Sequence, residues 1–139
     1  MSEEETYPTL IDLDEGEMML LNPHEDIRGR RVYDRDGEQL GDVDGLLVDE
    51  AEQKVRFVRL GSGGFLGIGK TKRLVPVDAI TRVEDSGVHI DRTKEHVAGS
   101  EPYDPTVLPA SDFYQRLYTH YGYPPFWAHG YMYPYPPPR

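Results

Sequence analysis

The residues most suggestive of chemistry lie between Gly64 and Thr71, where GFLGIGKT matches the phosphate-loop pattern G-x-x-x-x-G-K-[ST]. That pattern binds a nucleotide when a strand enters the loop and a helix leaves it, because backbone N–H groups and the helix N-terminus then surround the phosphates. A β-rich segment at 54–60 precedes the loop, but Pro76 follows soon after it between two valines. This order favours a strand rather than a helix. We therefore predict that the run is not a nucleotide site.

The same run has an alternative, structural interpretation. Five glycines at positions 61 to 69 suit a wide connection between strands, because glycine adopts positive φ without strain. Phe65, Leu66 and Ile68 interrupt these glycines and are too apolar for an ordinary solvated loop. They either fold onto the core or form an adhesive surface, and both interpretations stay open.

Other ligand-type residues give weaker patterns. Asp34, Asp36, Asp42 and Asp44 suggest calcium, but the residues around Asp36 and Gly37 lack the third oxygen ligand and the final glutamate of an EF-hand loop. Asp-Gly is instead typical of a tight hairpin turn. The five histidines show no i, i+4 pairing, and the chain has no cysteine. No G-x-S-x-G nucleophile elbow occurs. We predict a non-enzymatic chain without cofactor or metal.

The net charge of −10 is concentrated at one end of the chain. Residues 1–26 contain nine acidic residues and no lysine or arginine, whereas residues 27–100 contain thirteen of each sign. We expect an acidic N-terminal arm and an electrically neutral core. A neutral core disfavours the binding of nucleic acid, because that binding depends on an excess of cationic side chains. A set of basic residues nevertheless suggests an anionic partner, unless neighbouring carboxylates or the acidic arm neutralise their charge. These residues are Arg28, Arg30, Arg31, Arg35, Lys70, Lys72 and Arg73.

The elements that must position these residues are short strands. We predict strands at 30–34, 41–49, 54–60, 73–77, 80–83 and 88–90, separated by turn residues, with Pro76 confining its strand to an edge or a strand end. Regular short strands without a long intervening helix indicate an all-β barrel or sandwich. His89 alternates with two apolar neighbours and is therefore expected on the outward face.

Five ordered motifs in this region resemble the PRC-barrel domain family. They are IRGRRVYD from residue 27, DGEQLGDVDGLLVD from residue 36, VRFV from residue 55, GFLGIGK from residue 64 and LVPVDAI from residue 74. The resemblance extends over about residues 27–105. It implies a compact β-barrel that binds protein partners and lacks general catalytic residues. Relatives include the cytoplasmic domain of the photosynthetic reaction-centre H subunit and ribosome-maturation factors. This chain lacks the membrane helix of the former and the N-terminal β-domain of the latter.

Residues 106–139 form a distinct C-terminal extension. The segment 110–121 predicts about three helical turns, with Ser111 or Asp112 as N-cap and Gly122 as the stop. A tail rich in tyrosine and proline follows, and resembling relatives share its Tyr-Gly-Tyr-x-x-x-Trp ending. We expect Tyr118 to Trp127 to pack on a barrel surface, belonging to the same or a partner subunit, and residues 131–139 to be loose. The candidate interaction surface is Phe65, Leu66, Ile68, Phe113, Leu117, Tyr118, Tyr121, Tyr123, Phe126 and Trp127.

These features predict a non-catalytic interaction or assembly module that self-associates, most simply as a homodimer, since large apolar patches on soluble proteins mark interfaces. An RNA- or ribosome-associated assembly factor is the alternative. Peripheral attachment to a membrane or photosynthetic complex ranks third. With neither a basic leader nor a long apolar run in the sequence, we expect a cytoplasmic protein.

Overall fold

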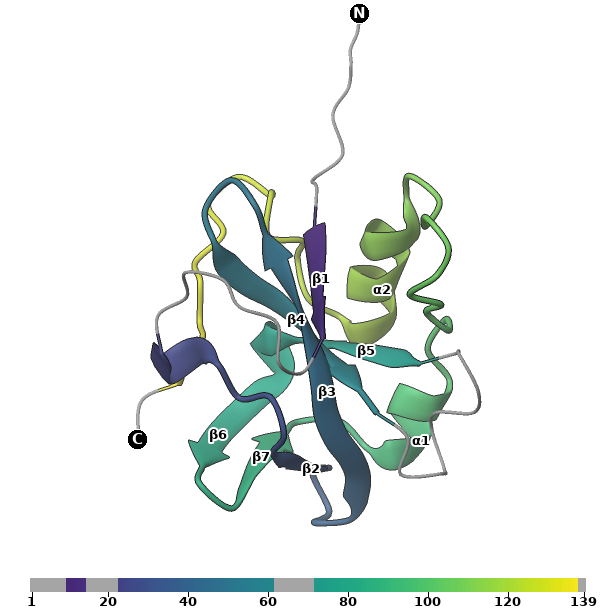
Figure 1. Cartoon of the computed structure of the whole chain (residues 1–139). Coiled ribbons are helices and arrows are strands. Elements are labelled where there is room, and N and C mark those ends of the chain that lie inside the picture. Colours follow the sequence, from purple (N-terminus) through teal and green to yellow (C-terminus); the bar gives the residue numbers. More distant parts are fainter. Residues whose placement is uncertain (1–9, 15–22, 62–71, 138–139) are drawn as a thin grey trace, which may run out of the picture.

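A computed structural model describes residues 10–14, 23–61 and 72–137 of the chain (Figure 1). Its described part contains a seven-stranded sheet with the order β5-β4-β3-β2-β7-β6, and β1 pairs separately with β3. The strands are β1 (Leu10–Asp14), β2 (Arg31–Tyr33), β3 (Gln39–Asp49), β4 (Lys54–Leu60), β5 (Arg73–Pro76), β6 (Ile80–Glu84) and β7 (Gly87–Ile90). Neighbours are antiparallel except for β2 and β7. The sheet curls into a half-barrel, as the all-β interpretation predicted.

The long strand β3 holds the two halves of this sheet together. Its first residues pair with β2, with Arg31 opposite Asp42, and its later residues pair with β4 on one edge and with β1 on the other. Register shifts interrupt its pairing with both β2 and β4. Such irregularities bend a strand and increase its twist. In Figure 1, β3 accordingly curves from the β6-β7 half toward the β1-β4 half.

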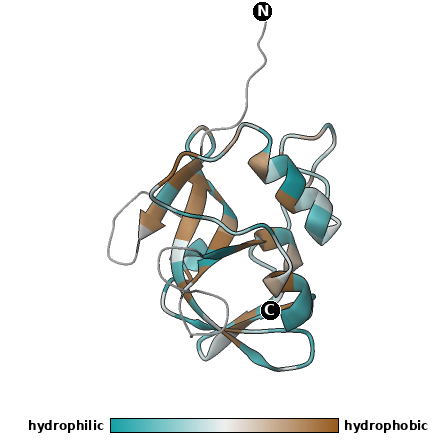
Figure 2. Cartoon of the chain, turned by 90° about the vertical axis from the view of Figure 1, so that its right-hand side faces the viewer, coloured by the Kyte–Doolittle hydropathy of each residue, from teal (hydrophilic) through white to brown (hydrophobic). Residues whose placement is uncertain are grey.

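The core lies inside this curl and explains the imperfect alternation along β4. Val55, Phe57, Val58 and Leu60 are all fully buried, so both faces of the strand are covered. The half-barrel covers one face, and the helix α2 (Phe113–Tyr121) together with the C-terminal residues covers the other, since Phe57 contacts Tyr118 at a ring-centroid distance of 5.0 Å. The hydropathy colouring shows the apolar strands together (Figure 2).

The predicted strands agree closely with the observed ones, and Pro76 ends an edge strand as expected. Two differences are informative. Leu10–Asp14 forms a strand within the segment expected to be only an acidic arm, and it pairs with β3 from Asp49 to Gly45. Two short 3₁₀ helices were also not predicted: η1 (Pro23–Glu25), and η2 (Val77–Ala79), which begins at the last residue of the predicted strand 73–77.

Two helices complete the described fold. The short helix α1 (Lys94–Ala98) is capped by Thr93, whose hydroxyl accepts from the N–H of His96. Helix α2 ends as predicted at Gly122, which adopts φ 85°. The two helices are joined by a reciprocal pair of hydrogen bonds, in which Nε2 of His96 and of His120 each bond to the other residue's carbonyl oxygen at 2.8 Å.

The expectation that residues 131–139 are loose is wrong for residues 131–137. The C-terminal tail, defined here as residues 123–137, runs back along the β3-β4 hairpin (Figure 1). Tyr135 is only 3% exposed, and its hydroxyl donates to the carbonyl oxygen of Glu25 at 2.8 Å. Prolines exclude a regular helix here, but they do not prevent an extended segment from packing through its side chains.

Candidate functional site

The glycine run that resembles a phosphate loop lies outside the described residues, but its flanks are informative. Strand β4 ends at Leu60, before the run, and Lys72 is already paired with Tyr103 in an isolated antiparallel bridge. Strand β5 then begins at Arg73. A strand therefore follows where the nucleotide motif requires a helix. Phe65, Leu66 and Ile68 also lie outside the described residues.

Of the carboxylates that suggested calcium, Asp34 holds the hairpin turn, and Asp44 bonds instead to Arg59 and Lys72. Oδ1 of Asp34 accepts the N–H groups of Asp36 and Glu38, and its Oδ2 accepts the N–H of Lys94, all at 2.8–2.9 Å. Burial raises the pKa of the Asp34 carboxyl, but these three backbone donors outweigh burial and lower the pKa below its usual range. In the part of the chain that the structure describes, no three His, Asp or Glu residues group as metal ligands would.

The basic residues proposed for an anionic partner are mostly bonded within the chain. The partners are Asp26 for Arg28, the carbonyl of Glu84 for Arg30, Asp91 for Arg35, Asp44 for Lys72 and the carbonyl of Ser100 for Arg73. Lys70 lies outside the described residues. This pattern fits the interpretation of paired surface charges and gives no support to an RNA-binding face.

The acidic arm bonds to a different arginine from those expected. Arg59 of β4 is 4% exposed and bonds to Asp12 of β1 and, at 2.8 Å, to Oδ1 of Asp44. The hydroxyl of Tyr103 donates to the other oxygen of Asp12 at 2.8 Å. Asp12 thus connects β1 to β4 and to the segment before α2.

The residues of the predicted interaction surface separate into two groups. Phe113, Leu117, Tyr118 and Tyr121 are buried against the chain's own half-barrel, at most 5% exposed. Tyr123, Phe126 and Trp127 lie at the start of the tail and stay partly exposed, with Trp127 at 40%. The helical spacing therefore identified side chains that pack inside the chain, whereas the partly exposed residues belong to the tail beyond α2.

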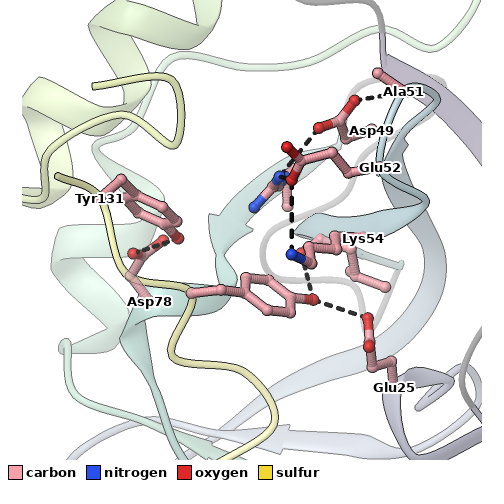
Figure 3. Close-up of polar contacts among 10 residues, drawn as sticks. Glu25, Asp49, Ala51, Glu52, Lys54, Asp78 and Tyr131 are labelled. Atoms are coloured by element: carbon pink, nitrogen blue, oxygen red, sulfur yellow. Dashed lines mark hydrogen bonds and ion pairs between the residues drawn. The ribbon is translucent and has the colours of Figure 1, made fainter. Parts of the chain in front are cut away.

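Arg56 is the centre of the surface on which the tail lies, called the tail site from here on. Its side chain, on β4, is only 3% exposed and bonds to Asp49 at 3.0 Å and to Glu52 at 2.9 Å (Figure 3). The guanidinium carbon lies 4.2 Å from the ring centroid of Phe126 and 5.2 Å from that of Tyr133. A cation in this position attracts the faces of aromatic rings, more strongly where water is excluded.

Tyrosine hydroxyls make the polar contacts between the tail and the tail site. Tyr131 donates to Oδ2 of Asp78 at 3.0 Å, and Tyr133 donates to Oε1 of Glu25 at 2.8 Å (Figure 3). Burial, followed by the carboxylate that each hydroxyl faces, raises the pKa of both tyrosines well above the usual range. These hydroxyls therefore keep their protons and act as donors at neutral pH.

Three polar atoms at the tail site lack partners among the described residues: Nε of Arg56, Oδ1 of Asp78 and the hydroxyl of Tyr118. Burial raises the pKa of the Asp78 carboxyl, against the lowering effect of the Tyr131 hydrogen bond and the Arg56 charge. Burial also raises the pKa of Tyr118, and the charge of Asp78 is the next largest cause. Unpaired buried polar groups are costly.

A second surface lies before α2, around Leu108. This side chain is 92% exposed, and Val107 beside it is 59% exposed. They border a hollow of about 260 Å³, which we call the Leu108 hollow, lined by Glu101, Pro102, Tyr103, Asp104, Val107, Leu108, Pro109, Ala110, Phe113 and Arg116. Arg116 bonds to Glu101 at 2.8 Å and to Asp112, so charged groups surround the apolar residues.

Sequence reasoning missed both surfaces. Arg56 alternates with apolar residues in β4, a pattern that normally indicates an outward, solvated side chain, but the rings of the distant tail cover it. Val107 and Leu108 stand alone between prolines and polar residues, without helical or strand periodicity. Two adjacent apolar residues in a turn-rich segment were the available signal.

The curled sheet, the helix that covers it and the contact surfaces define this chain as a small β-barrel domain. A comparison with protein-family models matches residues 22–97 to the PRC-barrel domain. The match covers more than half of the chain, which therefore belongs to the PRC-barrel family. Domains of this family act in general as non-catalytic interaction or assembly modules. A search of curated proteins found no match. Within the described residues, no helix has the length and apolar composition to span a membrane.

Proposed function

We propose that this chain is a non-catalytic assembly module that pairs with a second copy of itself through the Leu108 hollow. The observation that carries the proposal is the juxtaposition of a protruding apolar side chain and a neighbouring hollow. Leu108 is 92% exposed, whereas the floor of the hollow contains the nearly buried rings of Tyr103 and Phe113. Exposed apolar side chains are stabilised by removal from water, which a partner surface provides.

A two-fold axis makes this surface complementary to itself. In a two-fold dimer the same patch of both copies meets, so Leu108 of one copy enters the hollow of the other and the reverse contact forms simultaneously. The charged residues around the hollow, including Arg116 and Glu101, form a polar rim. An apolar centre within a polar rim is the usual anatomy of a protein interface.

The contact is small, and we therefore expect a weak, reversible dimer. Interfaces that bury less than ~1,200 Å² in total belong to transient complexes. The PRC-barrel family supports an interaction role in general. On the tail, Trp127 is 40% exposed and packs edge-on against Phe126 at 5.0 Å, and Met132 is exposed without a neighbouring hollow among those described.

The test is the mass per particle of the purified chain over a dilution series, measured by light scattering. We expect the wild type to be dimeric at roughly 50 µM, since weak interfaces have affinities at the micromolar end of the range, and Leu108→Glu to be monomeric because it places a charge at the apolar centre. Met132→Glu is the matched control, because Met132 is also an exposed apolar residue, at 84%, but lies on the tail. A monomeric wild type, or equal loss of dimer in both variants, contradicts the proposal.

A further inference from the structure

The tail contacts the barrel through its side chains and not through backbone pairing with the strands. Its backbone hydrogen bonds, within the described residues, are local: Tyr123 to Tyr118, Ala128 to Pro125 and Tyr131 to Ala128. Contacts with β4 and with the 3₁₀ helices η1 and η2 come instead from aromatic rings and hydroxyls. A segment that binds through side chains alone can be supplied by another chain with the same side chains.

The side chains of the tail follow a repeating pattern. Tyr131, Tyr133 and Tyr135 point toward the barrel and bond to it, whereas Met132 and Pro134 between them and Pro136 after them are exposed. Alternation with a period of two is expected of an extended segment that lies against a surface. Prolines hold such a segment extended before it binds, which reduces the conformational entropy lost on binding.

The tail site presents a matching set of groups. The Arg56 guanidinium faces the ring of Phe126, and Oδ2 of Asp78 and Oε1 of Glu25 accept hydroxyl protons from two tyrosines. The carbonyl oxygen of Val55 provides an additional acceptor for the Tyr133 hydroxyl, at 3.1 Å. The site is therefore built for an extended segment with an aromatic residue followed by alternating tyrosines.

Several polar atoms of the tail site have no hydrogen-bond partner among the described residues. Nε of Arg56, which belongs to a nearly buried side chain, and the hydroxyl of the fully buried Tyr118 lack hydrogen-bond partners among the described residues, as does Oδ1 of Asp78. The tail compensates by being tethered, because a short linker gives it a local concentration on the order of millimolar. A segment with the same aromatic pattern and an additional polar side chain can compete with it.

We propose that the tail site is a recognition site for tyrosine- and proline-rich extended segments of another protein, and that the chain's own tail occupies it as a tethered competitor. The recognised segment has the pattern Tyr-x-Tyr-Pro-Tyr preceded by an aromatic residue. This proposal is independent of pairing through the Leu108 hollow, which lies on a different part of the chain.

The experiment uses the full chain with a protease site inserted between Tyr123 and Pro124. Cutting it removes the tether but leaves both pieces present. A synthetic peptide of residues 124–137 with Trp127→Phe is then added, and Trp127, the only tryptophan of the chain, reports displacement of the native piece by its fluorescence. We expect saturable exchange. A peptide with Tyr133→Phe should bind about three- to tenfold more weakly, because it lacks one hydrogen-bond donor. A peptide with Met132→Ala should bind as well as the parent, because Met132 points outward.

Three results would overturn the proposal. The cut piece could dissociate without measurable rebinding of the peptide at about 100 µM, a concentration well below the local concentration of the tethered tail. The remaining chain could lose its β-sheet circular dichroism as the piece leaves, which would make the tail an integral part of the fold. Finally, the Tyr133→Phe and Met132→Ala peptides could bind to the tail site with equal affinity, which would show that the Tyr133 hydroxyl does not contribute to recognition.

Discussion

The guanidinium carbon of Arg56 lies 4.2 Å from the centre of the Phe126 ring, and this contact joins the middle of strand β4 to the C-terminal tail. Arg56 is 2% exposed, and its charge is balanced by Asp49 at 3.0 Å and by Glu52 at 2.9 Å. The tail therefore covers a buried ion pair. Its docking and the stability of the barrel are coupled through this one side chain.

Arg56→Ala should lower the free energy of unfolding by about 3–5 kcal/mol, because it leaves the nearly buried Asp49 carboxylate without its partner. Urea denaturation followed by circular dichroism measures this change. Arg82→Ala is the control: Arg82 is 60% exposed and pairs with the exposed Glu84, so its loss should cost at most about 0.5 kcal/mol. Equal effects of the two substitutions would contradict the described burial of Arg56.

Gly122→Ala should destabilise the protein by about 1–2 kcal/mol, because Gly122 ends α2 with φ 85° and a β-carbon is strained in that conformation. The space itself is adequate, since the nearest atom to an added β-carbon, on Arg92, would be 3.6 Å away. Gly122→Asn should cost less, because asparagine tolerates positive φ. Thermal melting compares the two, and a larger loss with asparagine would argue against the backbone explanation.

Gly45→Ala should detach β1 from the sheet. An added β-carbon would lie 2.6 Å from the Arg59 guanidinium carbon and 2.8 Å from the carbonyl oxygen of Leu13. Such crowding typically costs about 1–3 kcal/mol. Hydrogen exchange measures the result directly: amides of residues 10–14 should exchange faster in the variant, while those of β7 stay protected. Unchanged exchange rates in residues 10–14 would show that the sheet accommodates the added β-carbon without releasing β1.

Asp34 should make stability fall in acid. Its pKa is lowered in the folded state, so its contribution is fully present above the unfolded pKa of ~3.9 and is lost as the pH falls through the folded value. In Asp34→Asn the amide nitrogen replaces one acceptor oxygen, which leaves at least one of the three backbone N–H donors without an acceptor. The cost at pH 7 is about 1.5–3 kcal/mol.

Denaturation at pH 7 and pH 3 tests this prediction for Asp34. The difference between wild type and Asp34→Asn should shrink at the lower pH, because the unfolded wild-type carboxyl, with its pKa of ~3.9, binds a proton there that the folded carboxyl must lose. A stability difference that is the same at pH 7 and pH 3 would indicate that the hydrogen bonds of the three backbone N–H groups do not depend on the charge of the Asp34 carboxylate.

The strands of the half-barrel could be predicted because short apolar runs alternate with turn residues such as Asp36 and Gly37. Strand β1 was missed for a physical reason. Its residues Leu10, Ile11 and Leu13 lie in a strongly acidic segment, and the charge count obscured their pattern. The partners of the adjacent Asp12, Arg59 and Tyr103, are both distant in sequence, so no local pattern indicates that this carboxylate can lie against the sheet.

The tail illustrates the limit of local sequence patterns. Its prolines correctly excluded helix and central strand, but they were also taken to indicate loose structure from residue 131 onward. The informative feature was the spacing of Tyr131, Tyr133 and Tyr135, which places three hydroxyls on one side of an extended chain. Their acceptors, Asp78 and Glu25, come from two different parts of the sequence, so no local window contains the site.

Site-directed cross-linking tests pairing through the Leu108 hollow most directly. The chain has no cysteine, so single introduced cysteines report only their own contacts. Leu108→Cys chains are mixed with Ala110→Cys chains under mild oxidation, because Ala110 lines the hollow that Leu108 of the second copy should enter. We predict rapid formation of the mixed disulfide dimer, and little dimer when Met132→Cys replaces Leu108→Cys in the mixture. Equal cross-linking of both mixtures, or none in either, would contradict the proposed assembly.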